Sequence, residues 1–212
     1  PKDRYRDFFF FFFDVLEFRD FRDESFEPPT PKIPKYKWFD QATQFFSTEQ
    51  YFQTGGKNAL NMVLYETLNW KTRPFPTHEL VYKMVKRDMM SKAKSYREKD
   101  AFSTLKLRFS SIVNFDRYSR NVRIPISELM NRNIIFEWSD ETMEMLSHRT
   151  ALLLNKLYIY KKYERPNVIN IIVFEEARRH LKERTGQFGE SVLEILSTLA
   201  REMMIGLVFV TH

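Results

Sequence analysis

The sequence predicts an α/β fold in which a parallel sheet is joined to a mostly helical insertion. Short apolar runs at 133–138, 168–174 and 205–212 have the length and composition of strands. Helical patterns at 140–163 and 191–204 separate these runs, and strand–helix–strand connections place the joined strands parallel in one sheet. Because parallel sheets are normally covered on both sides, we expect both faces of this sheet to be buried.

The chain divides into three segments by composition. Residues 1–50 are an N-terminal irregular segment with one apolar strand; residues 1–40 lack helical spacing, and "ESFEPPTPKIPKYKW" holds four prolines. Residues 51–128 are rich in helical patterns and form the predicted insertion. Residues 129–212 carry the strands listed above, so we expect them to form the C-terminal part of the core.

The apolar strand of the first segment is a run of six phenylalanines, Phe8–Phe13. A membrane-spanning helix needs roughly 20 apolar residues, so this run is too short to cross a bilayer. It predicts a buried strand, and a loop that dips into a membrane is the alternative.

Apolar spacing predicts which faces of the helices are buried. One helix of the insertion has the spacing i, i+3, i+4 and i+8 at Leu60, Val63, Leu64 and Leu68. Pro76 and Thr77 predict the start of the next helix, whose buried side holds Leu80, Met84 and Val85. The long helix at 140–163 is expected to bury Met143, Leu146, Thr150, Leu153, Leu154 and Leu157.

The bulk composition sets limits on the class of protein. With 212 residues, 43% of them hydrophobic and 29% charged, the chain suits one globular domain or one core with an inserted subdomain. The absence of cysteine excludes disulfides and thiolate metal sites. Together with the absence of a signal peptide, it predicts a cytoplasmic protein, either free or peripheral to a membrane complex. The first residue is not methionine and the chain stops directly after a strand-like run, so we expect a piece of a longer protein.

Polar residues follow two of the predicted strands at the point where each strand ends. Glu175 and Glu176 come directly after the strand at 168–174, and Thr211 and His212 close the next one. Ligands of parallel sheets bind at the carboxyl ends of the strands. Two adjacent carboxylates at such an end carry a desolvation cost, which a bound cation would offset.

Magnesium and a nucleotide would give these residues a common use. One acid would organise Mg²⁺, a second would orient or deprotonate the attacking water, and a polar residue on the neighbouring strand would sense the terminal phosphate. The alternative is that Glu175 and Glu176 open the following helix, where the helix dipole favours acids.

The segments "NIIVFEEARRHL" and "ILSTLAREMMIGLVFVTH" resemble the Walker B to sensor region of the HerA/FtsK superfamily. These are hexameric, DNA-pumping P-loop ATPases with relatives in type IV secretion and conjugation. The resemblance is specific from 129 to 212. Between about 50 and 128 it is limited to a helical stretch like the family's insertion. It implies a RecA-like P-loop NTPase core, ATP and Mg²⁺ as cofactors, DNA as a partner, and a homo-oligomer, most simply a hexamer.

The resemblance also assigns roles to individual residues. Glu175 stands at the position of the magnesium-organising acid, and Glu176 at that of the catalytic glutamate. Thr211 and His212 stand where the family has a Thr/Ser-Gln sensor that contacts the nucleotide. Arg201 falls on the arginine of a Gly-Arg-Lys turn, which implies a contact with a phosphate across a subunit boundary. The alternative role for Arg201 is to bond carbonyls at the end of its helix.

The chain departs from the family pattern in several places. Glu175 replaces the commoner Asp, Glu202 replaces the lysine of the turn, and His212 replaces Gln. No Gly-x-x-x-x-Gly-Lys-Ser/Thr phosphate loop occurs; the nearest string, Gly55-Gly56-Lys57, is followed by asparagine and is interpreted as a turn that caps a helix. A Walker A is therefore expected outside this chain.

Two functions follow from these observations. The first is the motor domain of an ATP-driven DNA translocase, an ATPase provided that the phosphate loop lies elsewhere. The alternative is a non-catalytic scaffold, or a nucleic-acid-binding relative that has lost the loop. The resemblance does not identify a membrane or nuclease partner.

A basic run is the second candidate site. "KMVKRDMMSKAKSYREK" has seven Lys or Arg residues, and basic residues with the interleaved Tyr82 and Tyr96 could track a phosphate backbone. The candidate nucleic-acid-binding residues are Lys83, Lys86, Arg87, Lys92 and Lys94. The alternative is a solvated helix face.

Overall fold

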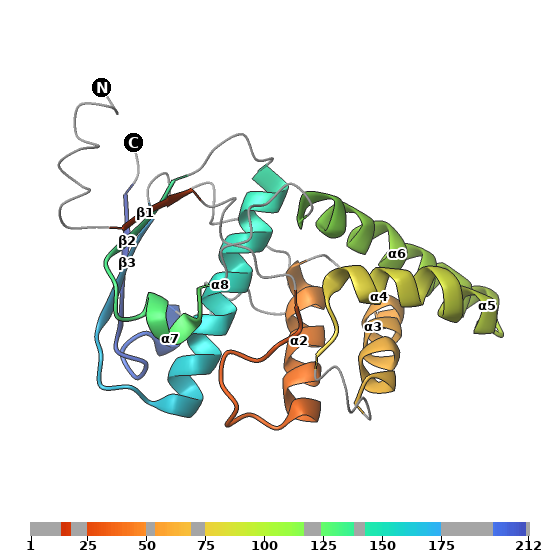
Figure 1. Cartoon of the computed structure of the whole chain (residues 1–212), viewed down its shortest axis with the longest axis horizontal. Coiled ribbons are helices and arrows are strands. Elements are labelled where there is room, and N and C mark those ends of the chain that lie inside the picture. Colours follow the sequence, from red (N-terminus) through yellow and green to blue (C-terminus); the bar gives the residue numbers. More distant parts are fainter. Residues whose placement is uncertain are drawn as a thin grey trace.

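The computed structural model describes residues 14–17, 25–49, 54–68, 75–116, 124–137, 143–174 and 197–210. Helix α8 (Met143–Glu164) crosses the middle of the molecule (Figure 1). Short strands lie on one side of α8, and a layer of helices lies on the other side. In the described part of the chain, no helix is long and apolar enough to cross a membrane.

The helical layer begins earlier in the chain than the sequence predicts. Helix α2 (Lys35–Glu49) starts inside the segment expected to be irregular. The prolines end at Pro34, whose carbonyl accepts the Trp38 amide at 2.9 Å, so the proline-rich run leads directly into a helix. Trp38 is buried, and its indole N–H donates to the Phe26 carbonyl at 2.8 Å. This contact ties the extended segment to the core.

The remaining helices of the layer follow in chain order. They are α3 (Thr54–Glu66), α4 (His78–Met84), the π-helical turn η2 (Val85–Met89), α5 (Met90–Lys92) and α6 (Tyr96–Asp116). The predicted start of α4 is confirmed, because the Thr77 hydroxyl caps it by accepting the Leu80 amide at 3.1 Å. A cluster of aromatic rings, including Phe26, Phe46 and Phe109, packs around His78 between these helices.

The predicted buried face of α3 is confirmed at Leu60, Val63 and Leu64, which are fully buried. We expect Leu64→Ala to lower the free energy of unfolding by about 2–5 kcal/mol, because the lost methyl groups leave a cavity in a packed core. Met62 lies on the same helix and is 52% exposed, so Met62→Ala should stay within about 0.5 kcal/mol of the parent. Urea denaturation of the two variants measures both values, and equal costs would contradict this packing.

Helix α8 is buried more widely than one apolar stripe predicts. Leu154 is buried as expected, but Thr150, Leu153 and Leu157 are only partly buried. The other buried residues of the helix are Leu152, Ile159, His148, Arg149, Asn155, Lys156 and Lys161. The reason is the position of α8 between two layers, which covers more than one of its faces (Figure 1). The side chains of Met143 and Leu146 lie outside the described residues.

The strands form two parallel pairs. β1 (Asp14–Glu17) pairs with β2 (Ile134–Glu137), and β3 (Asn170–Phe174) pairs with β4 (Ile205–Phe209). The three strands predicted in the C-terminal segment are therefore confirmed, and so is the parallel pairing of the last two. Among the described residues, however, β2 pairs with β1 and not with β3, so the predicted single sheet is not observed there. The predicted strand at Phe8–Phe13 lies outside the described residues. A short helix, α7 (Ile126–Leu129), precedes β2.

The prediction that both faces of the sheet are buried is wrong for β3. Ile172 and Phe174 pack against the core, whereas Ile171 and Val173, which alternate with them, are 69% and 58% exposed. Residues that alternate along a strand point to opposite faces. One face of this pair is thus covered by the core cluster and the other is open.

Candidate functional site

The strands β3 and β4 end side by side at one edge of their sheet. Phe174 pairs with Phe209 in the parallel register, and their rings stack with centroids 5.4 Å apart. The Val210 amide donates to the Phe174 carbonyl at 2.9 Å, which extends the pairing by one residue. The carboxyl ends of the two strands are therefore immediate neighbours.

The predicted catalytic residues follow these strand ends in the sequence. Glu175 and Glu176 come next after Phe174, while Thr211 and His212 come next after Val210. All four lie outside the described residues, so their side-chain geometry stays a prediction. Among the described residues, no group of three His, Asp or Glu side chains could hold a metal ion.

Arg201 lies at the opposite edge of the sheet from those ends. It is exposed and sits in the turn that leads into the amino end of β4, where its carbonyl accepts the Met204 amide at 3.3 Å. Met204 has φ of 53°, a left-handed conformation that reverses the chain, and Ile205 then bonds back to the Ala200 carbonyl at 2.8 Å. A five-residue strand is about 13 Å long, so Arg201 is remote from the carboxyl end of β4 in its own chain.

The polar interruption of β3, Asn170, has a structural explanation that sequence reasoning missed. Its side-chain amide donates to the Met130 carbonyl at 3.0 Å, and its backbone amide donates to the Met204 carbonyl at 3.0 Å. Asn170 thus joins the start of β3 both to the end of α7 and to the turn before β4. The only sequence signal was a single amide within an apolar run.

The glycine string at Gly55 and Gly56 is interpreted from the sequence as a turn that caps a helix, but both glycines lie within the first turn of helix α3 itself. The preceding described element is helix α2 rather than a strand. A Cβ at Gly55 would lie 3.4 Å from the Ala101 Cβ, which is van der Waals contact, so Gly55 lies at the contact between α3 and α6. The Lys57 ammonium hydrogen-bonds the Gln44 side chain. The glycine string is therefore part of a helix that packs against α6 and α2.

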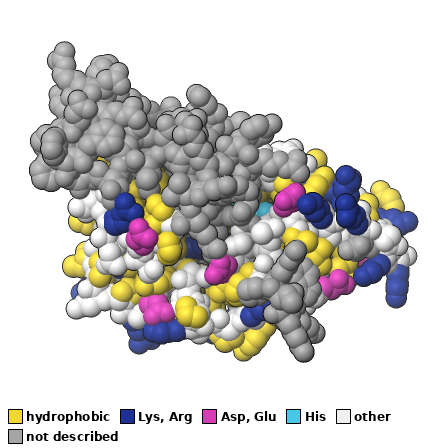
Figure 2. Space-filling model, in the orientation of Figure 1, with side chains coloured by type: hydrophobic (Ala, Val, Ile, Leu, Met, Phe, Trp, Pro, Cys, Tyr) yellow, Lys and Arg dark blue, Asp and Glu magenta, His cyan; other side chains and the backbone are white. Residues whose placement is uncertain are grey.

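The predicted nucleic-acid-binding residues Lys83, Lys86, Arg87, Lys92 and Lys94 are all exposed. Lys83 pairs with Glu79 at 2.9 Å, and Lys92 lies 3.9 Å from Glu66. Figure 2 shows dark blue side chains gathered at the end of the molecule that holds α5. The basic run and the β3–β4 strand ends therefore lie at opposite ends of the molecule.

Among the described residues, three with shifted pKa values make contacts that join separate segments of the chain. Hydrogen bonds from Lys32 and Thr30 hold the pKa of Glu164 below its ordinary value and attach the proline-rich segment to the end of α8. Burial lowers the pKa of Lys161, whose ammonium donates to the Val168 carbonyl just before β3. Burial also lowers the pKa of Lys35, which donates to the Thr67 carbonyl at 2.9 Å.

A cleft of about 840 Å³ lies between the proline-rich segment and residues 124–126. Its walls are largely proline, isoleucine and phenylalanine, with the cations Lys35 and Lys156 among them. The lining includes neither the ends of β3 and β4 nor the basic run, so the cleft is separate from both predicted sites.

No family model matches the chain, and no curated protein matches it. The resemblance to the HerA/FtsK superfamily therefore remains a prediction based on the residues from 129 to 212.

Proposed function

We propose that the chain is the motor domain, or most of it, of an ATP-driven DNA translocase of the HerA/FtsK type. The observation that supports this proposal is the in-register parallel pairing of Phe174 with Phe209. The acids and the Thr-His pair follow two strand ends that are direct neighbours, as a nucleotide site at the edge of a parallel sheet requires. A phosphate loop from outside these 212 residues completes the proposed site.

The proposed roles follow from the chemistry of each side chain. Glu175 holds Mg²⁺, directly or through water, and Glu176 accepts a proton from the attacking water. Thr211 and His212 hydrogen-bond the terminal phosphate. Bound magnesium supplies positive charge that offsets the charge developing on the phosphates. Such a motor would work on DNA in the cytoplasm or at the cytoplasmic side of a membrane complex.

Arg201 has its proposed role in a neighbouring subunit. Arg201 is exposed and lies before the amino end of β4. The length of this strand therefore separates it from the proposed nucleotide site of its own chain. An arginine that acts on the next subunit's phosphates fits this position and requires a closed ring of identical chains, most simply a hexamer.

The second candidate function is a non-catalytic scaffold or nucleic-acid-binding relative. It is favoured by the glycine string at Gly55 and Gly56, which is used for helix packing. In this case the strand-end acids would serve only to open the following helix.

One assay on the protein encoded by the complete gene separates the two functions. We expect magnesium-dependent ATP hydrolysis that increases when double-stranded DNA is added. The measurement is phosphate release with and without DNA, and with EDTA as the control for magnesium. DNA binding without any hydrolysis would contradict the motor and support the second function.

A further inference from the structure

The end of the helical layer carries most of the protein's net charge. We call residues 83–99 the basic tip; they comprise the end of α4, the turns η2 and α5, and the start of α6. The basic tip contains seven Lys or Arg and two Asp or Glu, a net charge of +5, whereas the whole chain has +6. The other residues of the chain together have a net charge of +1, so most of the net positive charge lies in the basic tip.

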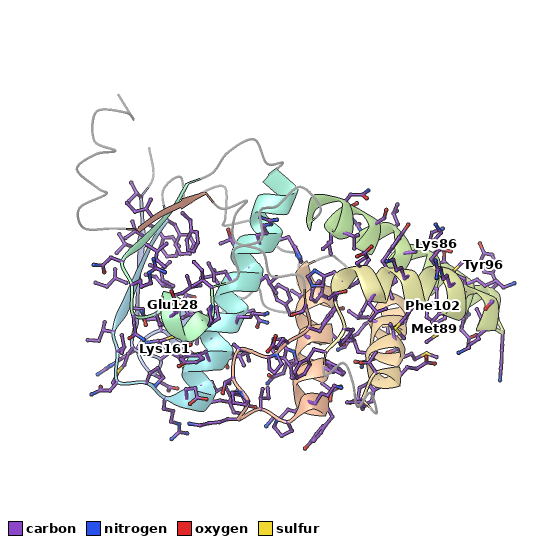
Figure 3. All side chains as sticks on the ribbon, in the orientation of Figure 1. Lys86, Met89, Tyr96, Phe102, Glu128 and Lys161 are labelled. Atoms are coloured by element: carbon purple, nitrogen blue, oxygen red, sulfur yellow. The ribbon has the colours of Figure 1, made fainter. Side chains whose placement is uncertain are left out.

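The π-helical turn η2 exposes two of the basic residues of the tip. Val85 and Met89 are buried, and Met89 lies with Phe102 in the core cluster, so the turn η2 is anchored to the helical layer. Between these anchors, Lys86 and Arg87 are exposed. Figure 3 shows Lys86, Met89, Tyr96 and Phe102 together at this end of the molecule. Wide turns of this kind are rare and occur often at functional sites.

The acidic side chain at the start of α6 is directed to the backbone. Glu98 accepts the amides of Lys94 and Ser95 at 2.6 and 3.3 Å, and the Ser95 hydroxyl accepts the Glu98 amide at 3.2 Å. This reciprocal arrangement is a capping box, which satisfies the first amides of the helix. Lys86, Arg87 and Lys94 make no ion pair with any described side chain, in contrast to Lys83 and Lys92.

An exposed aromatic ring lies among these cations. Tyr96 is 85% exposed, and it is the one large hydrophobic side chain of the basic tip that is exposed among the described residues. A segment that inserts into a membrane surface presents a row of exposed apolar side chains. A single ring with flanking cations instead fits a nucleic-acid strand, because a base stacks on the ring and the phosphates meet the cations.

We propose that the basic tip binds single-stranded nucleic acid. Lys86, Arg87 and Lys94 contact successive phosphates, and an unpaired base stacks on Tyr96. The choice of DNA over RNA rests on the proposed function; the binding itself does not require nucleotide hydrolysis.

The test is fluorescence anisotropy of the 212-residue chain with a labelled oligodeoxythymidine of about 20 nucleotides, without ATP. The triple variant Lys86→Gln/Arg87→Gln/Lys94→Gln should bind at least about tenfold more weakly at about 50 mM salt. The plot of log K against log salt has a negative slope, and this slope should become shallower by about 2 in the triple variant. Each lost phosphate contact reduces its magnitude by about 0.7. Tyr96→Ala should weaken binding by roughly tenfold, and Tyr96→Phe should keep it.

A matched control removes the same charges elsewhere. Lys37, Lys162 and Arg165 are exposed and lie outside the basic tip, and their triple change to Gln should alter the affinity less than about twofold if binding is local. Equal losses in the two triple variants would overturn the proposal, as would Tyr96→Ala binding like the parent. Preference for anionic vesicles over the oligonucleotide would assign the tip to a membrane instead.

Two further probes define the ligand. An equal affinity for a duplex of the same length would overturn the stacking role, and a stronger affinity for oligouridine would assign the tip to RNA. Because no nucleotide is present, a failure of the ATPase assay leaves this result standing, and a failure of binding leaves the ATPase result standing. Circular dichroism of each variant confirms that it is folded.

Discussion

Replacing Glu176 with glutamine is expected to lower ATP turnover by about 10²-fold or more while nucleotide binding is retained. Glutamine has nearly the same shape as glutamate but cannot accept a proton from water, so the change removes the proposed general base and leaves the site in place. The measurement is single-turnover ATP hydrolysis, together with binding of a fluorescent nucleotide, in a protein that carries the proposed phosphate loop.

The control for this variant is Glu128→Gln on α7. Glu128 is exposed and pairs at 2.7 Å with Arg132, which lies in the turn just after α7, and it lies before β2 rather than after β3. It should leave turnover unchanged. If Glu176→Gln also hydrolyses ATP at the parent rate, Glu176 is an acid that opens a helix, and the proposed catalytic site is wrong.

Arg201→Ala is expected to lower DNA-stimulated ATP turnover by about 10³-fold, because an arginine supplied by a neighbour stabilises the charge that develops during phosphoryl transfer. The structural basis is the exposed position of Arg201 in the turn before β4, at the edge of the sheet away from the strand ends that precede the two glutamates. The length of β4 separates Arg201 from those strand ends in its own chain, as the proposed action on a neighbouring subunit requires.

Mixed rings distinguish that role from a structural one. Arg201→Ala subunits are titrated into parent subunits while ATP hydrolysis is recorded. A loss steeper than the mutant fraction supports action on a neighbour, whereas a strictly proportional loss shows that each subunit works alone. Lys162→Ala, which removes an exposed cation at the end of α8, should leave the mixed rings fully active.

Local patterns in the sequence predicted three strands and the long helix of the C-terminal segment, but the helix expected over 191–204 ends at Leu199, and residues 200–204 form a turn. The strands β2, β3 and β4 are apolar runs bounded by polar residues, and α8 is a long helical pattern with lysines in its last turn. The start of α4 was readable because Thr77 caps it from within the same turn. These signals act between residues that are close in the chain, so one sequence is enough to detect them.

Other features depend on residues that are far apart in the chain. Helix α2 forms directly after four prolines because Trp38 finds the Phe26 carbonyl and a buried site, and nothing within the proline-rich run indicates this. The single amide of β3 was unexplained until Asn170 was seen to bond the Met130 carbonyl, 40 residues away. The wide burial of α8 likewise reflects the two layers that contact it.

The sequence by itself determined where the strand-end acids and the basic run lie along the chain, and which chemistry each could support. Only the tertiary structure decided their arrangement: β3 and β4 form a pair apart from β1 and β2, Arg201 lies at the other edge of that pair, and the basic tip lies at the far end of the molecule. The physical reason is that strand pairing and helix packing depend on surfaces brought together from distant parts of the chain, whereas residue type and spacing report only on near neighbours.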